Sequence, residues 1–325
     1  MPIPLIPEIP EELLKIFPTG RFVIFLGAGV SRLMNHPSWD LLADRCLGQL
    51  IGAPKITFSH ADLNILRALH PRKKLSIAVD IWEESGQDLK DLLKHAIKSD
   101  GRSGSRVYEL LADIDVPFVT TNYDDCFLEA PRIKPIFAGA EKKMDRAEKQ
   151  DYPQRKPISA IASLTSKDLT DPANIIYLHG RLNDGSPLVL TTRDYIDHYR
   201  NSNVQEFLDQ LFDQYNVLFI GYGLDEEEII DFIIRRKRTA NETKHFRLIP
   251  FYSHEETLFK HLSNYYLQQC QVRLIPYRLD ENDHAQLEKV LAHWLPTIKS
   301  KIKPINFIEK TKLLLDPIIG CTDGT

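Results

Sequence analysis

The chain has 325 residues, of which 43% are hydrophobic and 26% charged, and its formal net charge at pH 7 is −4. This length can hold one large α/β domain with a smaller unit inserted or appended. A slightly acidic balance gives no reason to expect nucleic-acid binding. No segment approaches the roughly 20 apolar residues of a membrane span, so we predict a cytoplasmic protein with no membrane contact.

The four cysteines, Cys46, Cys126, Cys270 and Cys321, are widely separated in the sequence. Their spacing forms neither a C-x-x-C zinc clamp nor a disulfide framework. We therefore expect buried thiols in a reducing compartment and no metal site.

The first part of the chain predicts an extended arm and a short helix. Prolines recur up to Pro10, and a helical pattern over residues 11–17 ends at a Pro-Thr-Gly turn. Such arms often dock on a neighbouring subunit. We treat residues 1–20 as a separate N-terminal unit.

An apolar run over residues 22–26 breaks abruptly into glycines, and it predicts a strand buried on both faces. Gly27 and Gly29 lack a Cβ, so the phosphates of a ligand can approach the main chain closely. Ser31 adds a hydroxyl at the same turn. Arg32 replaces the third glycine of G-x-G-x-x-G, and no P-loop lysine follows, so a tight strand-to-helix corner is the alternative.

Further apolar runs predict strands over residues 116–121, 174–178, 217–220, 245–251 and 271–277, with helices between them. Residues 187–190 are expected to be short and extended. Residues 52–102 are a candidate helical insertion. A helix capped by Ser38 is expected directly before it in the sequence. The charged stretch 132–171 is interpreted as a mobile, solvated connection, and a last helix is expected over residues 283–294.

Strands that alternate with helices favour a doubly wound, Rossmann-like parallel sheet of about six strands, with a helical insertion and no zinc module. The main domain is expected over residues 21–300, and residues 301–325 form a tail or the start of a further region. Four predicted strands end in polar residues or glycines: at Gly27, at Asn122, at His179 and at Gly221. In a parallel sheet all four ends lie at one edge, where open α/β sheets bind ligands.

The ordered motifs G-A-G-V-S, T-T-N-Y-D, L-H-G and F-I-G-Y-G resemble the SIR2 (sirtuin-like) NAD-consuming fold over residues 21–295. Ser38-Trp39 and the V-L-T-x-x-D-Y run that ends at Tyr195 are more similar to bacterial SIR2-like domains of anti-phage defence proteins than to the protein deacylases. The paired zinc cysteines and the G-I-P-D-F-R segment of deacylase sirtuins are missing. The resemblance therefore implies NAD hydrolysis rather than peptide deacylation.

The side chains fit that reaction. Nicotinamide is bound to ribose as a cation and leaves neutral, so cleavage of the glycosidic bond requires neither a general acid nor a metal. We predict three catalytic residues. Asn122 holds a ribose hydroxyl or the water, His179 acts as the base, and Asp124 accepts a ribose hydrogen bond or stabilises positive charge.

The predicted NAD contacts come from three turns. The pyrophosphate cradle consists of Gly27, Ala28, Gly29 and Ser31, with Thr121 nearby, and the adenosine contacts are Gly221, Tyr222 and Gly223. The acids at 225–228 would repel phosphate there. These acids lie at the start of a predicted helix, and the basic run 235–238 lies at its end. Both sets of charges therefore match the helix dipole.

Structural alternatives exist for the key residues. Asn122 would cap a helix that starts near Tyr123, and His179 would be a hydrogen-bonded core histidine. Trp39 is expected to pack rather than to touch a ligand. Ser31 lacks the surrounding G-x-S-x-G elbow, so a hydrolase nucleophile is not expected.

The resemblance thus implies an NADase that depletes NAD in anti-phage defence by abortive infection. Such an activity would be held off until a partner protein, a fused sensor domain, a signal or homo-oligomerisation switches it on. The alternatives are an NAD-dependent deacylase or ADP-ribosyltransferase, and a non-catalytic sensor of NAD or ADP-ribose.

Overall fold

A computed structural model describes residues 2–51, 58–84, 89–99, 101, 104–131, 154–235 and 245–302. Seven parallel strands form one sheet in the order β3-β4-β2-β1-β5-β6-β7. In chain order the strands are β1 (Phe22–Leu26), β2 (Phe118–Thr120), β3 (Lys156–Ile158), β4 (Asn174–Tyr177), β5 (Asn216–Ile220), β6 (His245–Phe251) and β7 (Val272–Arg278). The predicted doubly wound α/β class is confirmed.

Alternate residues of each central strand face opposite sides of the sheet. In β1, Val23 and Phe25 join one buried cluster, whereas Phe22, Ile24 and Leu26 join the other. Such two-sided burial explains why the strand is a continuous apolar run rather than an alternating one.

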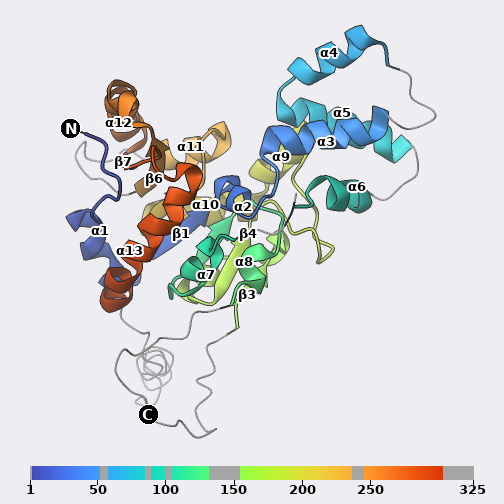
Figure 1. Cartoon of the computed structure of the whole chain (residues 1–325). Coiled ribbons are helices and arrows are strands. Elements are labelled where there is room, and N and C mark those ends of the chain that lie inside the picture. The colour runs from blue at the N-terminus through green and yellow to red at the C-terminus, as the bar shows by residue number, and fades with distance from the viewer. Residues whose placement is uncertain are drawn as a thin grey trace, which may run out of the picture.

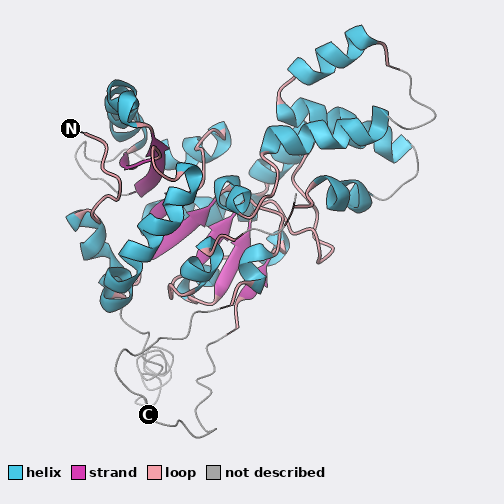
Figure 2. Cartoon of the chain, viewed as in Figure 1, coloured by secondary structure: helices cyan, strands magenta, loops and turns pink. Residues whose placement is uncertain are grey.

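Helices cover both faces of the sheet (Figures 1 and 2). The face of Val23 packs against α9 (Thr192–Arg200), α10 (Ser202–Gln214), α11 (Glu227–Ile234) and α12 (Glu256–Cys270). The face of Ile24 packs against α1 (Glu11–Ile16), α2 (Ala28–Leu33), α7 (Val107–Ala112), α8 (Cys126–Glu129) and α13 (Gln286–Lys301).

A separate group of helices stands to one side of the sheet in Figure 1. It comprises α3 (Trp39–Ile51), α4 (His60–Ala68), α5 (Pro71–Glu84) and α6 (Leu89–Ala96). Leu42, Leu75 and Leu92 belong to a third core of its own. The predicted helical insertion therefore exists, and α3 packs with it. The boundaries at 52 and 102 lie among residues outside the described ranges, and the domain division stays a prediction.

The N-terminal arm docks on α13 of its own chain. The side chains of Gln286 and Trp294 on α13 donate hydrogen bonds to the carbonyls of Leu5 and Pro7, at 2.9 Å and 2.7 Å. Ile3 is only 2% exposed. The arm thus completes one face of the fold.

Two expectations need correction: that residues 132–171 form a solvated connection, and that the sheet has about six strands. β3 lies within the stretch interpreted as a charged, solvated connection, and it raises the strand count from about six to seven. Arg155 next to it is buried, and its guanidinium donates hydrogen bonds to four backbone carbonyls, those of Ala112, Ile114, Val116 and Pro172. Residues 132–153 of that stretch lie outside the described residues.

Other elements lie close to their predicted ranges, and their ends differ. The last helix, α13, runs to Lys301, past Pro296. Residues 187–190 belong to no strand of the described sheet. Of the predicted tail, residues 303–325 lie outside the described residues. So do 236–238, three of the four positions of the basic run.

Candidate active site

The four strand ends singled out in the sequence are neighbours in the sheet. β4, β2, β1 and β5 stand next to one another, and Tyr177, Thr120, Leu26 and Ile220 are aligned in register. Because the strands are parallel, the residues that follow them meet at one edge. The chain order also reverses between β1 and β5, which is where such sheets open a crevice for ligands.

The two glycine turns contact each other at this reversal point. The N–H of Gly29 donates to the carbonyl of Gly221 at 2.8 Å, and the N–H of Gly27 donates to Ile220 at 3.1 Å. A Cβ at Gly29 would lie 2.7 Å from the Gly221 oxygen. Glycine is therefore required here for backbone packing, whatever else the turn binds. The roles of Gly27, Ala28 and Gly29 toward phosphate stay a prediction.

Ser31 is the centre of one hydrogen-bonded network, and only 4% of it is exposed. Its hydroxyl donates to Oδ2 of Asp124 at 2.7 Å and accepts from Nδ2 of Asn122 at 2.9 Å. The hydroxyl of Tyr108 lies 2.8 Å from the same oxygen. Since the serine proton goes to Asp124, Tyr108 donates. The network therefore holds three of the predicted site residues in a single arrangement.

Asn122 does not cap a helix. α8 begins at Cys126, whose N–H donates to Oδ1 of Asp124 at 3.1 Å. The Nδ2 group of Asn122 donates to the carbonyl of Gly27 at 3.2 Å as well as to Ser31. Both of its amide hydrogens are thus used within the protein. The acceptor Oδ1 is the atom left for a ligand or a water.

His179 is the centre of a second network. Its ring is 2% exposed, and Nε2 lies 2.9 Å from the hydroxyl of Tyr199 on α9. That hydroxyl donates to Oε2 of Glu226 at 3.1 Å, and Nε2 itself lies 3.6 Å from the same oxygen. Because the Tyr199 proton goes to Glu226, the imidazole donates through Nε2–H. The histidine is buried and hydrogen-bonded, as the core-histidine alternative also expected.

Burial shifts the pKa values in this second network. It lowers the pKa of His179 well below its ordinary value, with smaller effects from His198 and Arg72. It raises the pKa of Glu226 to about 7, against the opposing effects of Tyr199, Arg72 and Tyr222. The imidazole is therefore neutral at neutral pH, as a base must be before it acts.

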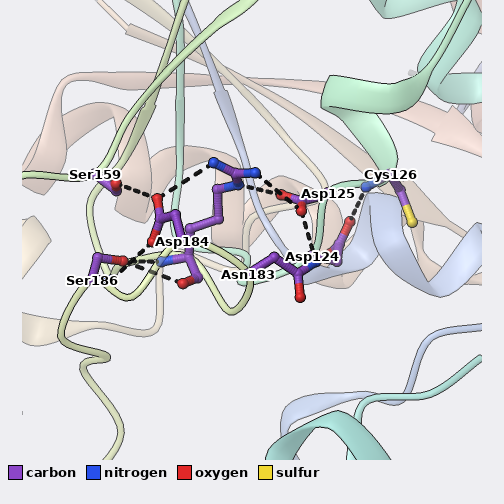
Figure 3. A network of polar contacts seen from close by, with 8 residues as sticks. Asp124, Asp125, Cys126, Ser159, Asn183, Asp184 and Ser186 are labelled. Carbon is purple, nitrogen blue, oxygen red and sulfur yellow. Dashed lines mark hydrogen bonds and ion pairs between the residues drawn. The ribbon is translucent and has the colours of Figure 1, made fainter. Parts of the chain in front are cut away.

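The loops that carry Asn122 and His179 are tied together. Arg181 forms an ion pair with Asp125, and Asn183 donates to Asp125 at 2.7 Å. Figure 3 shows Asp125 and Asn183 side by side, with Asp124 next to them. The N–H of Leu182 also donates to the carbonyl of Tyr123 at 3.1 Å. These contacts fix the two strand ends relative to each other.

The side chains of Asn122 and His179 belong to different networks. Asn122 interacts with groups on the α7 side of the sheet, and His179 packs among rings of α9. Tyr123 lies between the two loops, with its ring centroid 6.5 Å from that of His179. The sheet therefore brings the two residues to one edge without a direct hydrogen bond between them.

The second glycine turn is built into the core. Gly221 has φ 63° and Leu224 has φ 54°, a conformation that is unfavourable for leucine. The ring of Tyr222 packs against Phe25 and Phe219, at centroid distances of 4.7 Å and 5.8 Å. Adenosine contacts stay predictions for Gly221, Tyr222 and Gly223. The NAD contact expected of Thr121 also stays a prediction.

Several residues that form the two networks or tie their loops together were missed in the sequence. They are Tyr108, Tyr199, Glu226, Asp125 and Arg181. The acids at 225–228 were assigned to the helix dipole, yet Glu226 turns inward while Glu227 is exposed. The available sequence signal was the position of Glu226 three residues after Gly223, the last glycine of the turn. The tyrosines lie on helices distant in sequence, so no local pattern identifies them.

One group among the described residues has the composition of a metal site: His36, Asp124 and Cys126. Nε2 of His36 lies 3.0 Å from Sγ of Cys126, and Nδ1 lies 2.9 Å from the carbonyl of Ile97. Burial and nearby acids, Asp124 foremost, raise the pKa of the Cys126 thiol. A protonated thiol bonded to an oriented imidazole satisfies these groups without an ion.

An open depression of about 720 Å³ lies where the insertion meets the sheet domain. Its walls include Ser76 and Ile77 of α5 and Thr191 and Thr192 at the start of α9. Leu188 also lines this depression, and the next residue, Val189, donates its N–H to the carbonyl of His179 at 3.0 Å. The depression therefore borders the loop that carries the candidate histidine.

Residues 116–275 match the family model described as a SIR2-like domain. This segment is therefore similar to SIR2-like domains. This segment includes Asn122, Asp124, His179 and Glu226, whereas the glycine turn at Gly27 precedes it. The resemblance found in the motifs is thereby confirmed.

The chain is also similar to a curated protein, "Defense-associated sirtuin 2" of Bacillus subtilis. The two are 24% identical over 327 residues, an alignment that covers 96% of this chain and 29% of that protein. The chain thus spans less than a third of the length of this relative. Because it covers 96% of the chain, the alignment extends well beyond the SIR2-like segment, to the glycine turn and the helical insertion.

Three further features of the chain bear on these comparisons. Within the described ranges, no helix is both long enough and apolar enough to cross a membrane. Cys46, Cys126 and Cys270 are free thiols. No C-x-x-C pair exists in the sequence to form the zinc module of the deacylases.

Proposed function

We propose that this chain hydrolyses NAD to nicotinamide and ADP-ribose. The observation that carries the proposal is the pair of networks at one sheet edge. One fixes the amide of Asn122 through Ser31, and the other holds a neutral His179 against Glu226. The match to a SIR2-like family, whose resemblance implies NAD as substrate, gives the fold-level support.

The bond that breaks joins the cationic nicotinamide to ribose. Nicotinamide takes the electron pair and leaves neutral, so the protein has to stabilise an oxocarbenium-like sugar and deliver a water. Oδ1 of Asn122 accepts a hydrogen bond from that water or from a ribose hydroxyl. His179 accepts the proton that the water loses as it attacks. Asp124, anchored by Ser31 and the N–H of Cys126, adds negative potential next to the developing cation.

The biological setting is proposed by analogy with the relative that aligns with 96% of this chain. The Bacillus subtilis protein is named as defence-associated, and depletion of NAD would stop phage growth by stopping the cell. The proposal includes a cytoplasmic location, a homo-oligomer, and an activating partner or a fused sensor domain. It includes neither nucleic acid nor membrane as a ligand.

Two alternatives use the same fold. An NAD-dependent deacylase or ADP-ribosyltransferase would transfer ribose to another acceptor, and the missing zinc cysteines count against the first. A sensor would bind NAD or ADP-ribose without turnover, and it would need no base. The neutral, buried imidazole of His179 favours turnover.

The test is release of nicotinamide from NAD by the purified chain, compared with Asn122→Ala. We expect a loss of about 10²–10³-fold in the variant, the range seen when one polar group that orients a reacting atom is removed. Asn64→Ala on the exposed side of α4 is the matched control and should leave the rate unchanged. Product analysis with an acylated peptide separates deacylation from hydrolysis.

NAD binding is measured in parallel by calorimetry. The wild type could bind NAD without releasing nicotinamide. If neither a change in oligomeric state nor added cell extract then restores release, the sensor alternative is favoured. Undiminished release by Asn122→Ala would remove this residue from the mechanism. Absence of both binding and release would contradict the proposal.

A further inference from the structure

Glu226 is a buried carboxyl group that the proposed reaction does not yet use. Only 17% of its side chain is exposed, and it stands at the start of α11 rather than on the surface with Glu227. A buried carboxylate is unfavourable unless charged or hydrogen-bonding partners compensate for lost hydration. Its position therefore calls for a reason beyond helix capping, and no capping hydrogen bond from its side chain is present.

The groups that face Glu226 come from six places. Two of them are tyrosines on loops at the sheet edge, Tyr222 after β5 and Tyr123 after β2, and burial keeps both phenols neutral. The other four places carry the remaining groups. Tyr199 and Tyr195 project from α9, Arg72 from α5, Glu228 from α11, and His179 from the loop after β4. Arg72 is engaged by Glu228 through two hydrogen bonds, at 2.7 Å and 3.0 Å, and its guanidinium stacks 3.6 Å from the ring centre of Tyr195. Arg72, whose charge acts on Glu226, is thus largely neutralised by another acid, and no lysine or arginine of the described ranges forms an ion pair with Glu226.

Hydrogen bonds connect Glu226 to the imidazole in a fixed order. His179 donates from Nε2 to the hydroxyl of Tyr199, and Tyr199 donates to Oε2 of Glu226. With Nε2 as the donor, Nδ1 is the acceptor nitrogen of the ring. Nδ1 makes no hydrogen bond to any residue in the described ranges. It is therefore the atom that can take a proton from outside this chain of contacts.

We propose that Tyr199 and Glu226 are positioning residues that form a proton relay behind His179, and that Glu226 is the final proton acceptor of the reaction. The inference rests on the proposed hydrolysis of NAD. When water attacks the sugar, its proton goes to Nδ1 of His179. The Nε2 proton moves to the Tyr199 oxygen, and the Tyr199 proton moves to Oε2. The carboxylate becomes a carboxylic acid, while His179 and Tyr199 are neutral before and after.

The electrostatics of the site favour this end state over the alternatives. An imidazolium is disfavoured because burial lowers the pKa of His179. A phenolate is disfavoured because burial and the nearby Glu226 raise the pKa of Tyr199 well above its usual value. Glu226 has a pKa of about 7, so it accepts a proton near neutral pH at little free-energy cost. The relay thus moves one proton without leaving a new charge in a poorly hydrated site.

The kinetic test compares Glu226→Gln with Glu227→Gln, its exposed neighbour. The amide introduced by Glu226→Gln would still accept a hydrogen bond from Tyr199 but cannot take up a proton. We expect kcat for nicotinamide release to fall about 10²-fold in Glu226→Gln, with KM changed less than about threefold. Tyr199→Phe, which breaks the relay and keeps the carboxyl group, should show a similar loss. Glu227→Gln should match the wild type.

The pH profile separates a relay from a structural role. In the wild type, kcat should rise with an inflection near pH 7 as Glu226 ionises and becomes able to accept the proton. The inflection should vanish in Glu226→Gln. An unchanged kcat and pH profile in that variant would overturn the relay. A raised KM with normal kcat would also overturn it, because Glu226 would then serve binding alone.

A readout without turnover keeps this inference distinct from the proposed function. ¹⁵N NMR of His179 in the whole chain should show the Nε2–H tautomer and a shift with a midpoint near pH 7 that Glu226→Gln abolishes. If that result appears but NAD is never cleaved, the proposed hydrolysis fails, while the coupling between His179 and Glu226 stands. If NAD is cleaved but the shift is the same in both proteins, the relay fails and the hydrolysis stands.

Discussion

The two networks at the sheet edge are built from different chemistry. The Ser31 network joins a hydroxyl, an amide and a phenol around the single carboxylate of Asp124. The His179 network joins an imidazole, a phenol and a buried carboxyl group whose pKa is about 7. The first orients groups around a fixed charge, whereas the second contains a carboxyl group that can take up and release a proton near neutral pH.

Their energetic demands differ accordingly. In the Ser31 network the serine oxygen has three partners, so its buried polar atoms are satisfied by neighbours. In the His179 network burial shifts the pKa values of His179 and Glu226 in opposite directions, and both shifts favour the neutral form. The Ser31 network therefore positions its groups without lowering the stability of the fold. The His179 network keeps its two titratable groups buried at a cost in folding free energy.

The largest expected effect concerns the contact between the glycine turns, which joins the two networks. In Gly29→Ala the new Cβ would lie 2.7 Å from the backbone oxygen of Gly221, and a backbone atom cannot move aside. We expect a loss of about 3 kcal/mol in the free energy of unfolding by urea. Gly48→Ala is the control. It lies in α3 with open space around its Cβ and should gain roughly 0.5–1 kcal/mol.

Equal stability of the two alanine variants would show that the turns are not in contact as described. A loss confined to Gly29→Ala would confirm that this glycine serves packing, and NAD binding by any folded fraction would then show whether it also serves phosphate.

The second prediction isolates the charge of Glu226. The folded protein holds the pKa of Glu226 at about 7, above the ordinary value of 4.5. Ionisation therefore opposes folding, and this group's contribution to stability declines as pH rises from 4.5 to 7. Glu226→Gln should be more stable than the wild type at pH 8, by at most about 3 kcal/mol. The difference should shrink toward zero near pH 4.5.

Both proteins should also lose stability as pH falls below about 6.5, because the folded state disfavours protonated His179 and lowers the pKa of His198 to about 4. The wild type and Glu226→Gln share that loss, so the difference between their urea midpoints reports the ionisation of Glu226. A constant difference across this pH range would contradict the raised pKa.

The third prediction tests the neutral network. Ser31→Ala leaves Asn122, Asp124 and Tyr108 each without one buried partner. We expect a loss of about 2 kcal/mol in the free energy of unfolding, nearly independent of pH around neutrality. Ser300→Ala, on the exposed end of α13, is the control and should change stability by less than about 0.5 kcal/mol. A strong pH dependence in Ser31→Ala would show that the two networks are coupled.

The smallest effect concerns the insertion. Arg72 of α5 links it to α11 through Glu228 and to α9 through the ring of Tyr195. Because the pair is partly solvated, Arg72→Ala should lose only about 1 kcal/mol. Hydrogen exchange should report the loss as faster exchange in α5 and α9, with little change in the sheet. Arg67→Ala on the exposed face of α4 should leave exchange in both helices unchanged.

Most of the sheet could be predicted because its strands are buried on both faces and leave long apolar runs. β3 could not, since it is a short edge strand with an exposed lysine and proline and lies in charged sequence. Arg155 was misinterpreted for the same reason. Its charge suggested solvent, but four backbone carbonyls, which no local pattern reveals, compensate for its burial.

The candidate site shows the same division. Asn122 and His179 were identifiable since each directly follows an apolar strand. Glu226 lies beyond the glycine turn that follows β5, and its neighbours Glu227 and Glu228 made a dipole explanation sufficient. Only the hydrogen bond from Tyr199 on α9 shows that Glu226 turns inward, because a helix start places successive side chains in different directions.

The sequence by itself determined the parallel α/β class and the adjacency of four strand ends, because buried runs and glycine breaks are local properties of the chain. The tertiary structure alone decided which polar atoms share a proton and which glycines touch. Hydrogen-bond partners such as Ser31 with Asp124, or Tyr199 with Glu226, lie far apart in the sequence, and burial, which sets their pKa values, exists only once the helices close over the sheet.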